Sequence, residues 1–335
     1  MLTLACESSC DDTAVALVAD GREVVVNLIS SQIEIHRRFG GVVPEVASRK
    51  HLEAINPLLG EALAAGGGRR IDLVAATAGP GLLGALLVGL AAGKAAALAL
   101  GVPLVPVHHL EAHFAAAFLG AGRPLEHPFL GLVVSGGHAT LARAEGPRRF
   151  TVLAATQDDA PGELFDKIAR HLGLGYPGGP AIQRGGEGGD PERYPLPRPM
   201  AHQPDAMSFS GLKTAVLNLV RQAGDTLSLP DLCASLEEAV ADTLARKVAA
   251  ALERGAPPRL VLAGGVAANR RLRHRLAALA AHAGLEFLVP PIALCTDNAA
   301  MVAAQGFASR DLLPAADALR VNAVATWPLG GNWPL

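Results

Sequence analysis

Apolar runs of strand length, separated by short polar turns, dominate the first part of the chain. Three of them follow one another closely and predict a meander of three strands, at 2–6, 14–18 and 23–28. A different pattern then begins, with an apolar strand at 71–77, a Gly-Pro-Gly turn and a long alanine-rich helix at 83–100. The remaining elements expected in this part are a helix over 44–64, a strand over 102–107 and a helix that begins near 109.

The same order of elements returns after a loop rich in glycine and proline at 120–128. The first elements expected there are strands at 129–134, 139–144 and 149–155, a helix at 162–172, an irregular segment at 173–205 and a helix that opens at 208–214. The last ones are strands at 259–263 and 287–289 and helices at 230–254, 268–283 and 299–309. The order strand, glycine-rich turn, helix, strand thus occurs twice, each time after a meander, which predicts a duplicated fold.

Meanders combined with alternating strands and helices are typical of mixed sheets that carry helices on both faces. The duplication therefore predicts an α/β protein of two lobes, with a ligand-binding cleft between them. We expect an N-terminal lobe over 1–127 and a C-terminal lobe over 128–297. A C-terminal helix and tail over 298–335 should pack back on the N-terminal lobe.

The composition agrees with two packed lobes in a reducing compartment. Of 335 residues, 50% are hydrophobic and 18% charged, which is enough apolar material for two cores. The four cysteines form no CxxC pair and indicate reduced thiols. The first residues lack the basic flank and long apolar core of a signal peptide, and Gly-Pro-Gly interrupts the uncharged segment 73–93, so we expect a cytoplasmic protein outside the membrane. A net charge of −2 means that contact with nucleic acid needs a local basic patch or a partner.

Three histidines stand within six residues in the stretch Val-His-His-Leu-Glu-Ala-His at 107–113. On a helix, His109 and His113 would share a face, at a separation that one divalent metal ion bridges. Solvated imidazoles at a helix start are the other interpretation. Glu111 lies two residues from each of these histidines and would face away, and the order His-Leu-Glu-Ala-His differs from the HExxH of zinc peptidases. Asp297 is the better candidate for a third ligand, although its position equally fits a helix N-cap.

Four turns that follow strands are rich in glycine or hydroxyl groups, which lets backbone N–H groups approach an anion. They lie at 9–13, 79–81, 135–137 and 264–265, and their paired arrangement predicts a ligand that carries phosphate. The chain has no GxxxxGK[ST] motif and no GxGxxG motif after a strand, which disfavours a P-loop ATPase and a dinucleotide site. The basic stretch 270–275 has two interpretations, an RNA or phosphate contact and a solvated helix face.

Ten motifs, in this order along the chain, resemble those of the tRNA N6-adenosine threonylcarbamoyltransferases, a family once described as O-sialoglycoprotein endopeptidases. The motifs are ESSCDDT at 7–13, GGVVPEVASR at 40–49, GPGLLGALLVG at 79–89, HHLEAH at 108–113, VSGGH at 134–138, GELFDK at 162–167, YPGGP at 176–180, SFSGLKT at 208–214, GGVAAN at 264–269 and CTDNAAM at 295–301. The resemblance covers nearly the whole chain.

The resemblance implies the actin/Hsp70/sugar-kinase fold, with two ribonuclease-H-like lobes. It implies one divalent metal ion per subunit, iron or zinc, held by His109, His113 and Asp297. It also implies that the second lobe binds an acyl-adenylate through Val133, Val134, Ser135, Gly136, Gly137, Asp166, Gly179 and Asn269.

The implied reaction transfers the threonylcarbamoyl group from threonylcarbamoyl-AMP to N6 of adenosine 37, in tRNAs that read ANN codons. Asp11 and Asp12 are the candidates for accepting the amine proton or orienting the substrate. The expected partners are the tRNA, a non-catalytic paralogue of the same fold and a small P-loop ATPase. Two alternative functions are a metallopeptidase and an ATP-dependent small-molecule kinase of the same fold.

Overall fold

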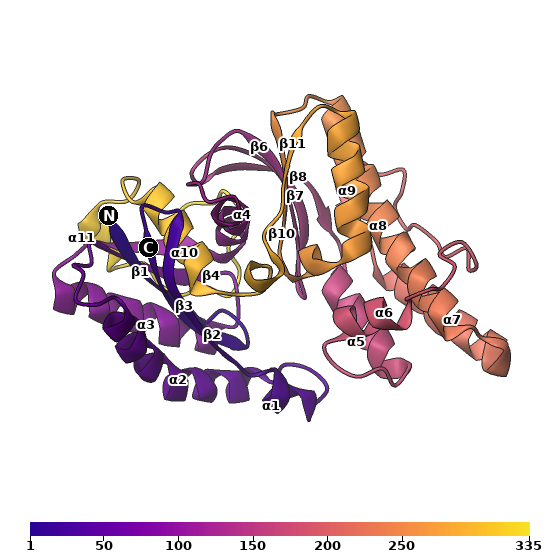
Figure 1. Ribbon diagram of the computed structural model, residues 1–335, viewed down its shortest axis with the longest axis horizontal. Helices are drawn as coiled ribbons and strands as arrows, with labels where there is room; N and C mark the ends of the chain where they lie inside the picture. The colour runs from indigo at the N-terminus through magenta and orange to yellow at the C-terminus, as the bar shows by residue number, and fades with distance from the viewer. The chain divides into compact units, whose positions relative to one another are not determined.

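The computed structural model describes residues 1–335, apart from the side chain of Ala315. The chain folds into two compact units, coloured along the sequence in Figure 1. Unit 1 comprises Met1–His127, Ala144–Phe150 and Pro290–Leu335, and unit 2 comprises Pro128–Arg143 and Thr151–Val289. The units differ from the expected lobes at two places. The segment 144–150 belongs to unit 1, and the chain returns to unit 1 at Pro290, so Asp297 lies in unit 1 and not in the second lobe.

Unit 1 is built on a five-stranded sheet in the order β3-β2-β1-β4-β5. The strands are β1 (Leu2–Glu7), β2 (Asp12–Ala19), β3 (Glu23–Ser31), β4 (Leu73–Gly79) and β5 (Leu104–His108). The first three pair antiparallel, as the predicted meander requires, whereas β4 and β5 extend the sheet in parallel with β1. The carboxyl ends of β1, β4 and β5 therefore meet at one edge of the sheet.

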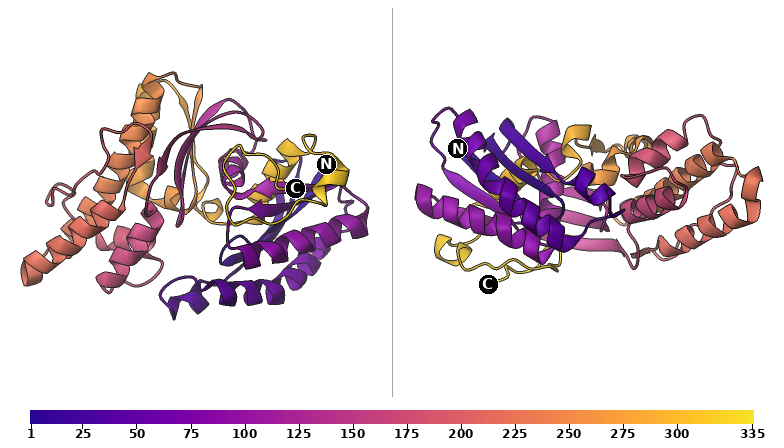
Figure 2. Two further views of the ribbon diagram at one scale, coloured as in Figure 1. Left: turned by 180° about the vertical axis from the view of Figure 1, so that it is seen from behind. Right: turned by 90° about the horizontal axis from the view of Figure 1, so that it is seen from below.

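Helices cover both faces of this sheet (Figure 2). Helices α2 (Pro44–Ala65) and α3 (Leu83–Leu100) pack on one face, and α4 (His109–Gly120) and α10 (Ala299–Ser309) pack on the other. Side chains alternate along β1, so that Leu4 joins the core under α2 and α3 and Ala5 joins the core under α4 and α10. Two short helices complete the unit, α1 (Ile33–Arg37) and α11 (Ala315–Ala318). Helix α3 is long and apolar enough to cross a membrane, but its buried side chains belong to the unit 1 core.

Unit 2 repeats this plan around a six-stranded sheet in the order β11-β10-β6-β7-β8-β9. The strands are β6 (Phe129–Val134), β7 (Ala139–Gly146), β8 (Arg149–Thr156), β9 (Ala206–Met207), β10 (Arg259–Ala263) and β11 (Glu286–Leu288). Five of them, in the order β8-β7-β6-β10-β11, correspond to the five strands of unit 1, and β6, β10 and β11 run parallel like β1, β4 and β5. The predicted duplication is confirmed, with β9 as an addition beside β8.

The helices of unit 2 include one that the sequence analysis did not expect. They are α5 (Pro161–His171), α6 (Gly178–Gly185), α7 (Ser210–Ala223), α8 (Leu229–Glu253) and α9 (Arg270–His282), with 3-10 turns at Gly224–Thr226 and Gly265–Ala268. Helix α6 lies in the segment 173–205, which was expected to be irregular. It packs between α5 and α8 and buries Ala181 and Ile182, so tertiary packing outweighs its high glycine and proline content.

Candidate metal centre and anion-binding turns

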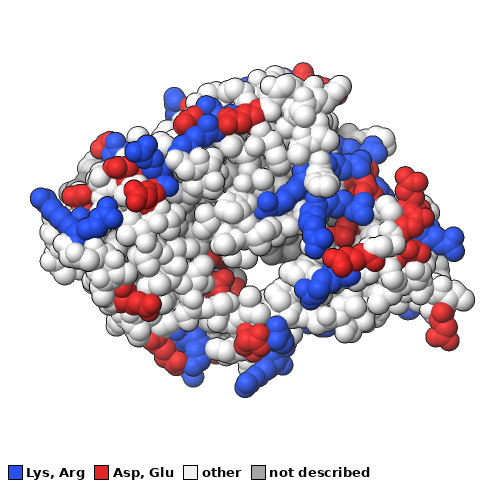
Figure 3. Space-filling model, viewed as in Figure 1, with Lys and Arg blue, Asp and Glu red and all other residues white. Residues whose placement is uncertain are grey.

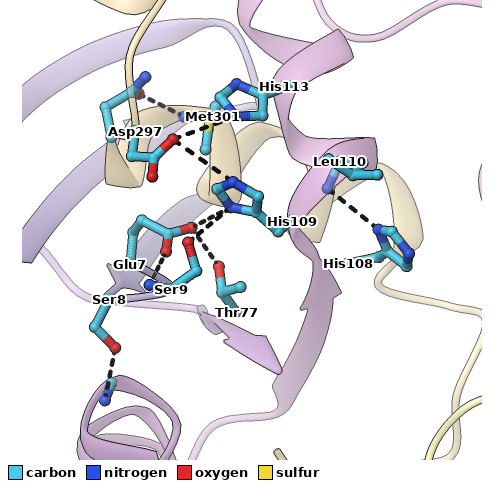
Figure 4. Close-up of polar contacts among 12 residues, drawn as sticks. Glu7, Ser8, Ser9, Thr77, His108, His109, Leu110, His113, Asp297 and Met301 are labelled. Carbon is cyan, nitrogen blue, oxygen red and sulfur yellow. Dashed lines mark hydrogen bonds and ion pairs between the residues drawn. The ribbon is translucent and has the colours of Figure 1, made fainter. Parts of the chain in front are cut away.

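His109, His113 and Asp297 converge in unit 1, at the edge where the parallel strands end (Figure 4). Each offers one ligand atom, and these atoms lie within 4.8 Å of one another. Asp297 Oδ1 lies 3.2 Å from His113 Nε2 and 3.5 Å from His109 Nε2. The two imidazoles are one helical turn apart on α4, with ring centroids 4.6 Å apart. The i, i+4 spacing therefore places both rings on one face of the helix, as predicted.

Asp297 is not the N-cap of α10, so that alternative is wrong. The N-cap is Asn298, whose side-chain oxygen accepts a hydrogen bond from Met301 N at 3.0 Å. Because the neighbouring asparagine satisfies the helix terminus, the Asp297 carboxylate is left to face the two histidines.

Glu7 lies behind His109, and the sequence analysis did not assign it a role. Its Oε2 lies 3.1 Å from His109 Nδ1 and accepts a hydrogen bond from Thr77 Oγ1 at 2.7 Å. Its Oε1 accepts a hydrogen bond from Ser9 N at 2.5 Å. The Glu7 side chain is completely buried. A glutamate that ends the apolar run Leu-Thr-Leu-Ala-Cys was the available signal, because such a position rarely holds an unpaired charge.

The charges of this cluster set the protonation of the two histidines. Burial disfavours a charged imidazole, but Asp297 and Glu7 outweigh it and raise the pKa of His109 to about 9. Burial lowers the pKa of His113; Asp297 opposes this shift, and the neighbouring His109 adds to it. Burial alone would raise the pKa of Glu7, but His109 and Thr77 hold it below its usual value. Burial and the neighbouring charges thus move the pKa values of the two histidines in opposite directions.

The cluster fits a divalent transition metal. Neither ring nitrogen of His113 has a hydrogen-bond partner of normal geometry among the residues that the structure describes, although Nε2 lies close to Asp297. A buried imidazole without such a partner is costly unless another species occupies that direction. Two imidazole nitrogens and one carboxylate oxygen are a ligand set that zinc and iron both accept.

The other two polar residues of the histidine stretch have structural roles. His108 caps α4, since its Nδ1 accepts from Leu110 N at 3.2 Å and its Nε2 lies 3.0 Å from the carbonyl oxygen of Trp327. Glu111 is buried on the opposite side of α4 from the metal cluster, where its two oxygens lie 3.1 and 3.3 Å from Arg148 Nη1. Burial raises the pKa of Glu111 to about 7, although Arg148 opposes the shift.

Asp11 and Asp12 lie in the turn that follows Glu7 and at the start of β2. Burial raises the pKa of Asp12 to about 7, a hydrogen bond with Ser31 opposes the shift, and Asp297 and Asp11 add to it. Burial and then Asp297 also raise the pKa of Asp11. Both carboxylates thus belong to the same acidic neighbourhood as Asp297, outside the three-residue cluster.

In unit 2, the predicted adenylate-binding turn lies where two parallel strands end. Val133 pairs with Ala263 in the register of β6 and β10, so the turns after the two strands are adjacent. Gly264, with φ +87°, passes so close to β6 that a Cβ there would lie 2.4 Å from Val134 O. The carbonyl of Ser135 accepts a hydrogen bond from Gly162 N at 3.2 Å, which joins the turn to the start of α5.

Asp166, Gly179 and Asn269 connect the helices around this edge. The Asp166 carboxylate accepts from Gly178 N at 2.6 Å and so ties α5 to the first turn of α6, which contains Gly179. Asn269 is the N-cap of α9, and its amide donates to Glu237 on α8. Glu237 lines a cavity of about 720 Å³ in unit 2. The eight predicted adenylate-binding residues thus belong to the end of β6, to the turns after β6 and β10, and to the helices joined to these turns.

Three of the four arginines in the basic stretch at 270–275 are paired with acidic side chains. Arg271 Nη1 lies 2.9 Å from Glu238, and Arg275 contacts both Glu238 and Asp242 of α8. Arg270 contacts Glu187 at 3.2 Å. In Figure 3, blue and red side chains accordingly lie next to one another in this region. Arg271 and Arg275 thus fasten α9 to α8, a role that neither interpretation of the stretch contains.

Comparisons with known proteins agree with this arrangement. A family model described as "tRNA N6-adenosine threonylcarbamoyltransferase" matches residues 23–304. A protein of that name from Geotalea uraniireducens is 49% identical over 337 residues, which cover 98% of this chain and 97% of the relative. Another, from Anaeromyxobacter dehalogenans strain 2CP-1, is 53% identical over 309 residues, which cover 90% of this chain and 92% of the relative.

Solved structures show the same fold at low sequence identity. Full-length HypF in its phosphate- and nucleotide-bound form matches 93% of this chain with 46% of its own, at a TM-score of 0.62 and 13% identity. Component A of the (R)-2-hydroxyglutaryl-CoA dehydratase from Acidaminococcus fermentans matches 92% of this chain with 98% of its own, at a TM-score of 0.53 and 16% identity. The expected actin/Hsp70/sugar-kinase fold is confirmed.

Proposed function

This chain belongs to the tRNA N6-adenosine threonylcarbamoyltransferase family, and on that premise we propose that it modifies adenosine 37 of tRNAs that read ANN codons. The donor would be threonylcarbamoyl-AMP and the acceptor the N6 amine of the adenosine. Two observations together carry the proposal. Relatives that are 49% identical cover 98% of this chain, and His109, His113 and Asp297 converge in one cluster.

The metal centre would consist of His109, His113 and Asp297. The position of His113 Nε2 beside His109 Nε2 and Asp297 supports a ligand role, and so does the N-cap role of Asn298, which leaves the Asp297 carboxylate available. Iron or zinc, when bound there, would supply a Lewis acid to substrate oxygen atoms. The protein's own contribution is to hold two buried histidines and a partly exposed Asp297 together at the end of the unit 1 sheet.

The adenylate would bind to unit 2 through the turn Ser135-Gly136-Gly137. Backbone N–H groups of such a turn can donate to phosphate oxygens, and glycine allows the close approach that they need. Asp166 and Gly179 lie on the joined α5 and α6, and Asn269 lies beside the cavity lined by Glu237. These positions support roles in binding the nucleotide.

The chemical step is acyl transfer to a weak nucleophile, because the lone pair of the adenine amine is delocalised into the ring. The N6 nitrogen attacks the carbamoyl carbon, the bond from that carbon to the phosphate oxygen breaks, and AMP leaves with the electron pair. The amine must also lose a proton, for which Asp12 is the first candidate and Asp11 the second. A carboxylate with a pKa of about 7, like that of Asp12, is well matched to a general base near neutral pH.

The protein would act in the cytoplasm on tRNA, together with proteins that help to present it. Two observations support a need for such proteins. The net charge of the chain is −2, and Arg271 and Arg275 of α9 are paired with carboxylates of α8 and so are less available to RNA phosphates. A non-catalytic paralogue of the same fold and a small P-loop ATPase are the proposed partners.

Neither alternative function gains support. A metallopeptidase would need a base near the metal in the role of the HExxH glutamate, and Glu111 is instead engaged by Arg148. A small-molecule kinase has no support from the relatives, whose shared name is that of the tRNA enzyme.

The proposed function is tested by incubating unmodified tRNA with the protein, threonylcarbamoyl-AMP and the partner proteins. Nucleoside mass spectrometry should then show threonylcarbamoyladenosine at position 37. Casein cleavage with a chelator control and ADP release with candidate sugars or acids test the two alternatives. If casein is cleaved or ADP is released while no modified nucleoside forms, the proposed function is wrong and the corresponding alternative takes its place.

A further inference from the structure

Glu7 is a buried carboxylate at the end of β1, directly behind His109. We propose that Glu7 is a positioning residue that holds His109 in the tautomer with hydrogen on Nδ1 and a free lone pair on Nε2. This tautomer is the one in which His109 can bind a metal beside Asp297. The inference rests on the proposed metal centre and adds a residue that determines its affinity.

The hydrogen bonds of Glu7 assign the role of each of its oxygens (Figure 4). Oε1 accepts from the backbone N–H of Ser9, and Oε2 accepts from the hydroxyl of Thr77. An ionised carboxylate can only accept hydrogen bonds. His109 Nδ1, at 3.1 Å from Oε2, must therefore be the donor. With Nδ1 occupied in this way, His109 Nε2 is the nitrogen that faces Asp297.

Ser9 Oγ also lies 3.1 Å from His109 Nδ1, but it does not select the tautomer. A hydroxyl group can donate to an unprotonated nitrogen or accept from a protonated one. Only the carboxylate distinguishes the two tautomers. Metal-binding histidines generally donate their second N–H to a carboxylate or a carbonyl, which fixes the ring and makes it a better ligand.

The two histidines differ in this respect. His113 Nδ1 is buried and has no hydrogen-bond partner among the described residues, so the protein does not fix its tautomer in the same way. His109 is held from behind by a residue 102 positions away in the sequence. The cluster thus combines one preorganised imidazole with one adaptable imidazole, and the preorganised one depends on Glu7.

The substitution Glu7→Gln separates this role from simple filling of space. The backbone N–H of Ser9 can only donate, so the amide oxygen of the introduced side chain would take the place of Oε1. The amide NH₂ would then face His109 Nδ1 and favour the opposite tautomer, with hydrogen on Nε2. The Thr77 hydroxyl can rotate to accept from the same NH₂, so the substitution leaves every buried polar group with a partner.

The matched control is Glu111→Gln. It also replaces a buried carboxylate by an amide, and it lies on α4 itself, two residues from each histidine. Glu111 contacts Arg148 and Gln305, which are not members of the metal cluster. The control therefore measures what a buried amide does to α4 without a change behind His109.

The experiment measures Zn²⁺ and Co²⁺ affinity of the metal-free, full-length wild type and both variants by competition with a chromophoric chelator. Urea unfolding of the metal-free proteins confirms that they are folded. We expect Glu7→Gln to bind about 10–100-fold more weakly and Glu111→Gln to stay within about threefold of wild type. Equal affinity of Glu7→Gln and wild type overturns the inference, and so does an equal loss in both variants. A wild type that binds neither metal overturns the proposed metal centre and the role of Glu7 with it.

A second measurement needs no variant and remains decisive if Glu7→Gln fails to fold. Histidine ¹⁵N chemical shifts of the zinc-loaded wild type report which ring nitrogen carries hydrogen. Hydrogen on His109 Nδ1 supports the inference. Zinc bound to His109 Nδ1, with hydrogen on Nε2, overturns it.

Discussion

Arg148 provides the sharpest stability prediction, because its guanidinium joins α4, the helix that carries both histidines, to the C-terminal tail. It lies at the turn between β7 and β8 and contacts Glu111 on α4 through Nη1. It also donates to the carbonyl of Gly331 and lies 4.7 Å from the Trp327 ring centroid and 4.0 Å from that of Trp333. We predict that Arg148→Met destabilises unit 1 and releases the C-terminal tail.

The magnitude follows from the burial of the pair. Glu111 is fully buried and the Arg148 side chain is 9% exposed, so removal of the arginine leaves a carboxylate without its counter-ion in the interior. Breaking such a pair costs about 3–5 kcal/mol. We expect the lower end, about 3 kcal/mol, since a Glu111 carboxyl with a pKa of about 7 can take up a proton in the variant. Loss of the two cation–π contacts adds to this cost.

Equilibrium urea unfolding at pH 8, followed by tryptophan fluorescence, measures the change directly. The chain has two tryptophans, and both contact Arg148. The double variant Arg148→Met with Glu111→Gln should recover at least about 1 kcal/mol, because it no longer buries an unpaired carboxylate. If the double variant is no more stable than Arg148→Met, the cost does not arise from Glu111 and the reasoning is refuted.

Three further predictions concern unit 2 and the metal. Gly264→Ala, at φ +87°, would place a Cβ against a backbone carbonyl and should raise KM for the adenylate by roughly tenfold or more with a smaller effect on kcat, as steady-state kinetics would show. Asp242→Asn should destabilise the protein by about 2 kcal/mol at pH 7 in urea unfolding, because Arg198, Arg246 and Arg275 all bond to this carboxylate. Burial opposes the shift, but those arginines hold the pKa of Asp242 below its usual 3.8. The stabilisation by Asp242 is therefore complete above pH 3.8 and is lost as the pH falls further, so the unfolding free energies of wild type and Asp242→Asn should converge at low pH. Chelation should lower the melting temperature of the isolated protein, and an unchanged melting temperature would contradict a bound metal. Zn²⁺ added at about 100 times its Kd should then raise the free energy of unfolding by about 2.7 kcal/mol.

The sequence predicted most elements because the apolar runs have clear periods and clear ends. The helix expected at 83–100 is observed as Leu83–Leu100, where the Gly-Pro-Gly turn precedes it and Gly101 in the left-handed region ends it. Helix α6 escaped prediction because its stability comes from packing on α5 and α8, which a local pattern does not contain. The short strand β9 has only two residues, too few for a periodic signal.

The metal cluster was only partly visible in the sequence. The i, i+4 spacing of His109 and His113 is a local property and could be read directly, whereas spacing alone left Asp297 undecided between ligand and N-cap. Asn298 takes the N-cap role, and this becomes evident only from the hydrogen bond to Met301. Glu7 was not predicted, because its contact with His109 joins the ends of β1 and β5, which are far apart in the sequence.

The central claim is that the cluster of His109, His113 and Asp297 is the catalytic metal centre of a tRNA-modifying enzyme. The most direct test is the amount of threonylcarbamoyladenosine formed at position 37 by wild type, His109→Ala and Glu111→Gln, with circular dichroism as a check on folding. The account predicts modification by wild type and Glu111→Gln, and none by a folded His109→Ala protein that has lost its metal. Full modification by metal-free His109→Ala would contradict it.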